Sequence, residues 1–290
     1  MKTPYILKGL VSLGYNSVSK ILPAYLASIG IGPVSIATIN SSYHFAKGAS
    51  GIITGPIIDR IGWIKSFRYS MALTTVMLAL FLLFAKTDAA LMLLFLGIGA
   101  TLAVAYFSID AMVTGSRRKS EELSKLEFAY QIGFVAGPII GGLLALTYGF
   151  QSAVVFWIVC SLAGFALSFS IPCDKSHVTK RNSCAIAEIK KAIMSAPATF
   201  VSFLAFGALF TGFAEGVRDI AVPLNAHNLG MDIAAIGAIF TISAIVTAFG
   251  IVPLGRIFDA TGNKWGVIIG LALMAAGFDL TLQNARAFTS

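Results

Sequence analysis

The chain alternates long apolar stretches with short polar breaks. The apolar stretches are about twenty residues long, which is the length an α-helix needs to cross the hydrocarbon core of a bilayer. Read with a window of about nineteen residues, the pattern predicts an all-α polytopic membrane bundle of nine transmembrane helices. The predicted spans are Tyr5–Ala27, Val34–Ile57, Ser66–Ala85, Leu91–Val113, Phe128–Thr147, Ser152–Ile171, Thr199–Pro223, Asp232–Leu254 and Trp265–Leu282.

The longest polar break divides the predicted helices into two groups. Six helices precede it and three follow it. We therefore expect an N-terminal six-helix transmembrane bundle at residues 1–171, a cytoplasmic linker at residues 172–198, and a partial C-terminal bundle at residues 199–290.

Composition excludes a cytosolic enzyme. Only 12% of the residues are charged and 57% are hydrophobic, whereas soluble domains have about a quarter of their residues charged. The three cysteines, Cys160, Cys173 and Cys184, show neither CxxC spacing nor an even count, so they predict no disulfide framework and no metal site. Because no nucleophile, phosphate-loop or dinucleotide motif is present, we expect no enzymatic activity and no cofactor.

Lysine and arginine gather in alternate breaks, which gives the expected orientation. Cationic loops stay on the cytoplasmic side, so the N-terminus is predicted to be cytoplasmic. The net charge of +8 is then a topology signal; no basic run is interleaved with the stacking aromatics that nucleic-acid binding uses. The cationic breaks hold Lys2, Arg60, Lys65, Arg68, Arg117, Arg118, Lys119, Lys125, Lys175, Lys180, Arg181, Lys190, Lys191, Arg256 and Lys264.

A Gly-x-x-x-Asp-x-x-Gly frame occurs twice, after the second and after the eighth predicted helix. Glycines suit a tight turn between helices, and an acid followed by a base can cap and pair helix ends. Because the frame recurs one half later, it indicates an internal repeat. The first copy holds Gly55, Asp59, Arg60 and Gly62, with Lys65 following, and the second holds Gly255, Asp259 and Gly262.

On these two loops the sequence resembles the Major Facilitator Superfamily of secondary transporters, whose signature is Gly-x-x-x-Asp-Arg-x-Gly followed by basic residues. The resemblance implies two six-helix halves that rock around a central solute path. It also implies that the loop acts as a conformational latch, its acid engaging helix ends and nearby bases when the carrier faces outward. One position departs from the family pattern: Trp63 stands where the family usually has an arginine.

The fifth predicted helix carries glycines around a proline, at Gly133, Gly137, Pro138, Gly141 and Gly142. Glycines four residues apart make a flat helix face for close packing, and proline bends the helix. One interpretation is helix packing alone. The other is that the segment is similar to the Gly-Pro and Gly-Gly motif of the family's proton-coupled exporters, which favours efflux over uptake.

The seventh predicted helix carries three ionisable residues, Glu215, Arg218 and Asp219, on one helical face. Ionisable side chains at membrane depth cost at least about 2.5 to 3.5 kcal/mol, so those that occur face a cavity or one another. The cluster is interpreted either as a cavity-facing acid that exchanges a proton beside an internal base, or as an internally neutralised structural group.

Four further ionisable residues lie in the first four predicted helices. Lys20 is a candidate for the solute path, although its long side chain could instead snorkel outward. His44 and Lys47 are candidate substrate or proton groups, with His44 alternatively a satisfied hydrogen-bond donor. The excess of cations favours an anionic or zwitterionic substrate, or pairing with acids of the other half. Asp110 is expected to neutralise the second-to-third loop through Arg60 or Lys65.

Together these features predict a secondary active transporter that moves a small solute by alternating access, with proton-coupled efflux favoured, in a bacterial inner membrane. The alternatives are a solute–proton symporter and an incomplete or non-transporting membrane protein. The family pattern has twelve helices and this sequence predicts nine, so we expect the chain to be incomplete or the product of an interrupted gene, and its activity to depend on another chain that completes it. Pocket side chains in this fold are mostly apolar and generic, so the substrate is not specified.

Overall fold

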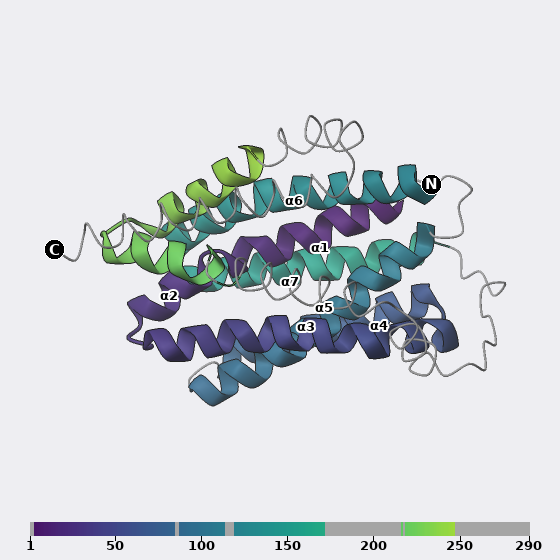
Figure 1. The fold of residues 1–290 in the computed structure, drawn as a ribbon, viewed down its shortest axis with the longest axis horizontal. Coiled ribbons are helices and arrows are strands. Elements are labelled where there is room, and N and C mark those ends of the chain that lie inside the picture. The colour runs from purple at the N-terminus through teal and green to yellow at the C-terminus, as the bar shows by residue number, and fades with distance from the viewer. Residues whose placement is uncertain (1–2, 85–86, 114–118, 172–215, 217, 247–290) are drawn as a thin grey trace, which may run out of the picture. The chain divides into compact units, whose positions relative to one another are not determined.

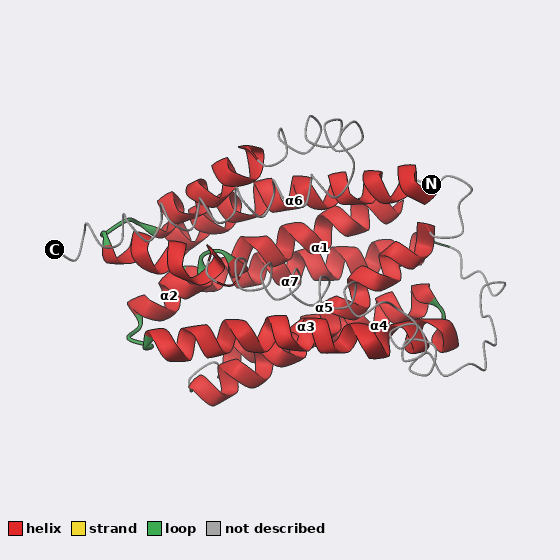
Figure 2. Ribbon diagram, in the orientation of Figure 1, coloured by secondary structure: helices red, strands yellow, loops and turns green. Residues whose placement is uncertain are grey.

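The computed structural model describes residues 3–84, 87–113, 119–171, 216 and 218–246 of the 290-residue chain. All regular secondary structure in these ranges is helical (Figure 1 and Figure 2), which confirms the predicted fold class. Several predictions fall outside the described residues: the linker at 172–198, the ninth helix, Glu215, and the second loop copy with Gly255, Asp259 and Gly262.

Helices occur at each of the first six predicted spans. The first span is covered by α1 (Thr3–Ser19) and α2 (Leu22–Ser28), and the next five by α3 (Pro33–Ile61), α4 (Trp63–Phe84), α5 (Asp88–Val113), α6 (Lys119–Tyr148) and α7 (Phe150–Leu167), the last extended by the 3-10 helix η1 (Ser168–Ser170). Residues 218–228 and Ile233–Val246 are also helical, and they overlap the seventh and eighth predicted spans.

The first span is interrupted at Lys20 and Ile21, where one continuous helix was expected. Pro23 lies in the first turn of α2. Its ring has no N–H to donate to the Ser19 carbonyl and clashes with that carbonyl, so α1 ends there. The interruption places Lys20 between two helices, inside the bundle.

The first copy of the loop motif is mostly helical. The predicted span ended at Ile57, but α3 continues through Gly55, Asp59 and Arg60 to Ile61. Gly62 is the single residue between α3 and α4, and its φ is +89°. Its N–H donates to the Ile58 carbonyl at 2.8 Å. Glycine takes this positive φ without the steric cost of a side chain, which explains the second glycine of the motif.

Glycines of α6 bring its backbone against α1, which lies along α6 and α7 in Figure 1. A Cβ atom added at Gly133 would lie 2.6 Å from the Gly9 carbonyl oxygen, and one added at Gly141 would overlap the Ser17 carbonyl oxygen. Gly137 faces Asn16 in the same way. These glycines therefore provide a close helix contact on the face of α6 that meets α1.

Four described segments are long and apolar enough to cross a membrane: Trp63–Phe84, Asp88–Val113, Lys125–Tyr148 and Phe150–Ser170. The other two of the first six spans, formed by α1 with α2 and by α3, carry most of the polar candidates, including Lys20, His44 and Lys47. Polar residues in spans favour a position facing the interior of a bundle.

Hydrogen bonds to one carboxylate, that of Glu122, join the start of α1 to the start of α6. Tyr5 Oη donates to Glu122 Oε2, and Lys125 Nζ donates to Glu122 Oε1 at 3.1 Å. These two donors hold the pKa of the Glu122 carboxyl below its usual value of 4.5, with Tyr5 the larger cause. Because both stabilise the charged form, their contribution to stability is present above the unfolded-state pKa and is lost as the pH falls through the folded-state pKa.

We expect Glu122→Gln to lower the melting temperature slightly at pH 7 and not at all below the folded-state pKa of Glu122. Thermal melts of the two proteins at a series of pH values from 7 to 3 measure this difference. A gap that is unchanged across the whole series would contradict the hydrogen-bonded, ionised state of Glu122.

Candidate solute path and its charge pairs

A buried ion pair joins the first span to the seventh. Lys20 Nζ lies 2.6 Å from Asp219 Oδ2, and both side chains are buried. The ammonium also lies 5.3 Å from the ring centroid of Phe134 on α6 and 5.6 Å from that of Phe240 on the Ile233–Val246 helix. Pairing with a carboxylate and two aromatic faces compensates the loss of water around the ammonium. The expectation that Lys20 snorkels outward is therefore wrong.

Arg218 and Asp219 were predicted to share one helical face, but their side chains differ in exposure. Arg218 Nε lies 3.1 Å from Asp219 Oδ1, but the Arg218 side chain is 43% exposed whereas that of Asp219 is 7% exposed. Asp219 therefore lies between a buried cation from the first span and a more exposed cation from its own helix. The third predicted member, Glu215, is outside the described residues.

A second ion pair joins α1 to α5. Lys8 Nζ lies 2.6 Å from Asp110 Oδ1. The expected partners of Asp110, Arg60 and Lys65, do not pair with it because they lie on exposed faces at the ends of α3 and α4. The expectation for Asp110 is corrected accordingly: it neutralises a buried lysine of the first span.

Tyrosines surround these charges. Lys8 Nζ and Lys47 Nζ lie 5.1 Å and 5.3 Å from the ring centroid of Tyr106. Tyr15 stacks on Tyr43 with ring centroids 4.9 Å apart, and Tyr106 meets Tyr130 edge-to-face at 5.8 Å. His44 contacts the Tyr43 ring edge-to-face at 5.1 Å. We call Tyr15, Tyr43, Tyr106 and Tyr130 the tyrosine cluster.

The tyrosine cluster was not predicted, although the spacing of tyrosines and charged residues in the sequence indicates it. Tyr43 precedes Lys47 by four residues and Tyr106 precedes Asp110 by four, so each tyrosine shares a helical face with a charged residue. A tyrosine that shares a helical face with a charged residue at membrane depth is expected to point its hydroxyl toward the interior of the bundle.

Several buried polar atoms beside the cluster have no protein hydrogen-bond partner within the described part of the chain. They belong to α1, α3 and α5. Buried polar atoms are nearly always hydrogen-bonded in folded proteins, so such a group marks a place that can bind water or a polar solute. The atoms are Asn16 Oδ1, Asn40 Nδ2, Tyr106 Oη and Ser108 Oγ.

The second face of the α6 motif packs against the Ile233–Val246 helix. A Cβ added at Gly142 would lie 3.0 Å from the Ala234 Cα, and one added at Gly237 would overlap the Pro138 carbonyl oxygen. Thr241 Oγ1 donates to the Val135 carbonyl at 2.9 Å. The glycine–proline segment therefore serves two contacts, one with α1 and one with a helix of the later group.

The first loop motif lies apart from these contacts. Asp59, Arg60 and Lys65 are exposed, and none of the three has an ion-pair partner among the residues that the structure describes. Within the same ranges, no group of three or more His, Cys, Asp and Glu side chains could hold a metal ion.

Comparisons with known proteins agree with this architecture. The family profile of the Major Facilitator Superfamily matches residues 5–214 and 204–288. An uncharacterized MFS-type transporter of Methanocaldococcus jannaschii is 23% identical over 288 residues, which cover 96% of this chain and 72% of the relative. Multidrug resistance protein 2 of Bacillus subtilis is 20% identical over 278 residues, which cover 87% of this chain and 65% of the relative.

A solved structure shares the fold. The crystal structure of a D-xylose–proton symporter superposes with a TM-score of 0.66 at 13% identity, covering 89% of this chain and 68% of that one. This chain thus spans about two thirds to three quarters of the length of these proteins. The chain belongs to the Major Facilitator Superfamily, whose members are membrane transporters and not enzymes.

Proposed function

We propose that the protein moves a small solute by alternating access and that the Lys20–Asp219 pair closes one end of its path. The observation that carries the proposal is this buried pair between the first and seventh spans. Rocking of the two halves must separate Lys20 from Asp219, whereas pairs within one half, such as Lys8 with Asp110, need not change.

The closed end is proposed to be the extracytoplasmic one. The basic breaks favour a cytoplasmic N-terminus, so α1 runs outward and Lys20 lies in the outer part of the first span. The contacts of Gly142 and Gly237 belong to the same outer part, near the end of α6 and the start of the Ile233–Val246 helix. The resemblance implies a latch that engages in the outward-facing state. Asp59 is exposed and has no ion-pair partner among the described residues, which supports a cytoplasm-facing state here.

Separating the pair has a cost that suggests proton coupling. A bare carboxylate and a bare ammonium in a low-dielectric interior are each strongly destabilised. A proton on Asp219 would remove the cost for the carboxylate, and an anionic group of the solute beside Lys20 would remove the cost for the ammonium. The proline-containing α6 motif supports proton-coupled efflux, and the Bacillus relative is named a multidrug resistance protein. The fold shared with a D-xylose–proton symporter supports symport as the alternative.

The solute is proposed to lie among the tyrosine cluster, Asn16 and Asn40. The tyrosine rings offer aromatic faces, and Asn16 Oδ1, Asn40 Nδ2 and Tyr106 Oη have no protein hydrogen-bond partner in the described part of the chain. The site therefore suits a small organic solute with a planar or apolar part and a few hydrogen-bonding groups.

The proposed location of the protein is a bacterial inner membrane.

The test is transport by the 290-residue chain in liposomes with an imposed pH gradient, using compounds chosen by a growth screen against toxic compounds and nutrients. If the chain transports without a partner chain, the flux should be driven by the gradient, Glu215→Gln should reduce it to background, and Glu127→Gln, at an exposed acid of α6, should leave it intact. A correctly inserted chain without flux for any compound would favour the incomplete or non-transporting alternative. Normal flux in Glu215→Gln would make Glu215 structural.

A further inference from the structure

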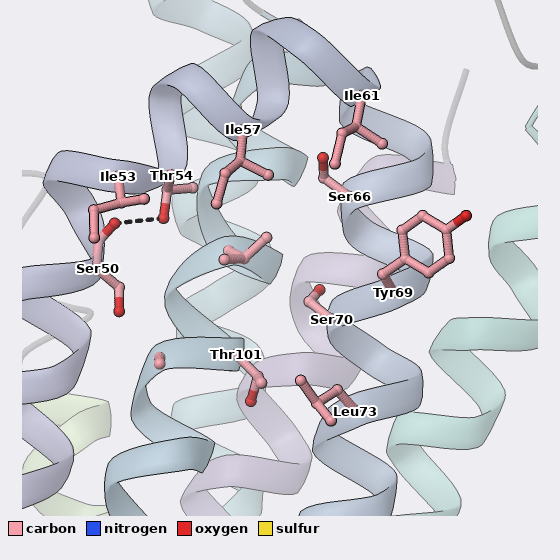
Figure 3. A pocket seen from close by; sticks show the side chains of 12 residues that line it. Ser50, Ile53, Thr54, Ile57, Ile61, Ser66, Tyr69, Ser70, Leu73 and Thr101 are labelled. Carbon is pink, nitrogen blue, oxygen red and sulfur yellow. Dashed lines mark hydrogen bonds between the residues drawn. The ribbon is translucent and has the colours of Figure 1, made fainter. Parts of the chain in front are cut away.

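A groove on the side of the bundle is separate from the solute path. It has a volume of about 320 Å³ and lies between α3, α4 and α5 (Figure 3). Ile57 forms part of its α3 wall, Leu73 part of its α4 wall, and Ala100 and Val104 part of its α5 wall. None of its lining residues belongs to the two charge pairs or to the tyrosine cluster, and α4 carries none of those residues.

The walls of this groove face the surroundings of the bundle. Ile53 is 62% exposed, Tyr69 66% and Leu73 46%. Both α4 and α5 are long and apolar enough to cross a membrane. Apolar side chains exposed on a membrane-spanning helix contact lipid tails, so hydrocarbon is the medium that reaches the groove.

The groove exists because small side chains line it on two helices. Ser66 and Ser70 on α4, with Ala100 and Thr101 on α5, leave space between larger residues. An apolar space of this size would forfeit many dispersion contacts if nothing filled it. A flexible, unbranched chain fits such a space better than a bulky or polar group.

One end of the groove meets charged groups at the turn between α3 and α4. Ile61 and Ser66 line that end, and Figure 3 places their side chains next to each other. Their sequence neighbours Arg60 and Lys65 are exposed, as is Asp59, so the three exposed charges sum to one positive charge. Ser66 Oγ is buried and has no hydrogen-bond partner within the described residues. The exposed Tyr69 at the same end is typical of the headgroup level.

We propose that this groove binds one acyl chain of an anionic phospholipid, with the lipid phosphate near Arg60 and Lys65. The acyl chain lies along Ile57, Leu73, Ala100 and Val104, and the glycerol esters lie at the level of Ser66, whose hydroxyl supplies a hydrogen-bond donor. The basic side chains give the preference for an anionic headgroup because each cation near a phosphate adds electrostatic attraction. The lipid would therefore connect the loop motif to the bilayer.

The test is native mass spectrometry of the purified 290-residue chain after incubation with equal amounts of phosphatidylglycerol and phosphatidylcholine that carry the same acyl chains. We expect one retained phospholipid per chain, with phosphatidylglycerol preferred. Ala100→Phe fills the groove and should lower the retained lipid about tenfold, the effect of losing about two buried methylenes of contact. The matched control is Leu93→Phe, which adds a similar ring at a 67% exposed position of the same helix outside the groove.

The headgroup is tested by Arg60→Gln combined with Lys65→Gln. This variant should still retain lipid but should bind the two phospholipids equally. Equal lipid retention by wild type and Ala100→Phe, or no retained lipid in the wild type, would overturn the proposal, as would an unchanged phosphatidylglycerol preference in the double variant. If Ala100→Phe is not monodisperse, Ala100→Leu provides the same comparison with a smaller side chain.

Discussion

Replacing Gly141 with leucine is expected to prevent the chain from forming a stable bundle. A Cβ at this position overlaps the Ser17 carbonyl oxygen of α1, and backbone cannot move aside as a flexible side chain can. The two helices must separate along a contact that also includes Gly133 and Gly137. The loss of unfolding free energy should reach or exceed the top of the range of about 1–3 kcal/mol seen for overpacked cores. Thermal melting and size-exclusion profiles of the detergent-purified protein measure it.

Gly48→Ala is the matched control for this substitution. Gly48 lies within α3, and an added Cβ would contact nothing within 4 Å. Alanine should be neutral there or stabilise the helix by up to about 1 kcal/mol. Gly237→Ala should fall between the two, since its Cβ overlaps the Pro138 carbonyl oxygen in a contact between the two groups of helices. A Gly141→Leu protein that melts with the wild type would contradict the close α1–α6 contact.

Replacing Asp219 with asparagine is expected to destabilise the protein strongly although the side chain keeps its size. The substitution leaves the buried Lys20 ammonium without its carboxylate, 2.6 Å away in the native protein. Removal of one partner of a buried ion pair costs about 3–5 kcal/mol because the remaining charge is uncompensated. The aromatic rings of Phe134 and Phe240 compensate only a part of this loss.

Asp88→Asn is the control for Asp219→Asn. Asp88 is an exposed acid in the first turn of α5, so its replacement should change the melting temperature only slightly. Equal melting temperatures for the two variants would mean that the Lys20–Asp219 pair contributes nothing to stability.

Most of the helical architecture could be predicted because hydrophobic length has a direct physical meaning in a bilayer. The details that differed depend on local backbone chemistry. Pro23 carries a recognisable signal for the interruption of the first span, but a hydropathy window averages over it. The window also ends α3 at the polar Asp59–Arg60 step, whereas the helix continues until Gly62 can adopt its positive φ.

The candidate site was predictable only as a set of residues, not as a set of pairs. Lys20, Asp110 and Asp219 stood out because charges are rare in apolar spans. Their partners depend on how helices pack: Lys20 and Asp219 are 199 residues apart, and Lys8 and Asp110 are 102 apart. The position of Asp110 near the cytoplasmic end of its predicted helix pointed to the loop bases, but the direction in which its face of α5 points decides the pairing.

The measurement that tests the central claim most directly is a double-mutant cycle on Lys20 and Asp219, using Lys20→Met, Asp219→Asn and both together. If the two side chains form one buried pair between the helix groups, the double variant should be more stable than Asp219→Asn alone, because no buried charge remains uncompensated. The two single losses should then exceed the double loss by more than about 1 kcal/mol. Single losses that simply add would show that Lys20 and Asp219 do not pair, and would contradict the proposed closure of the path.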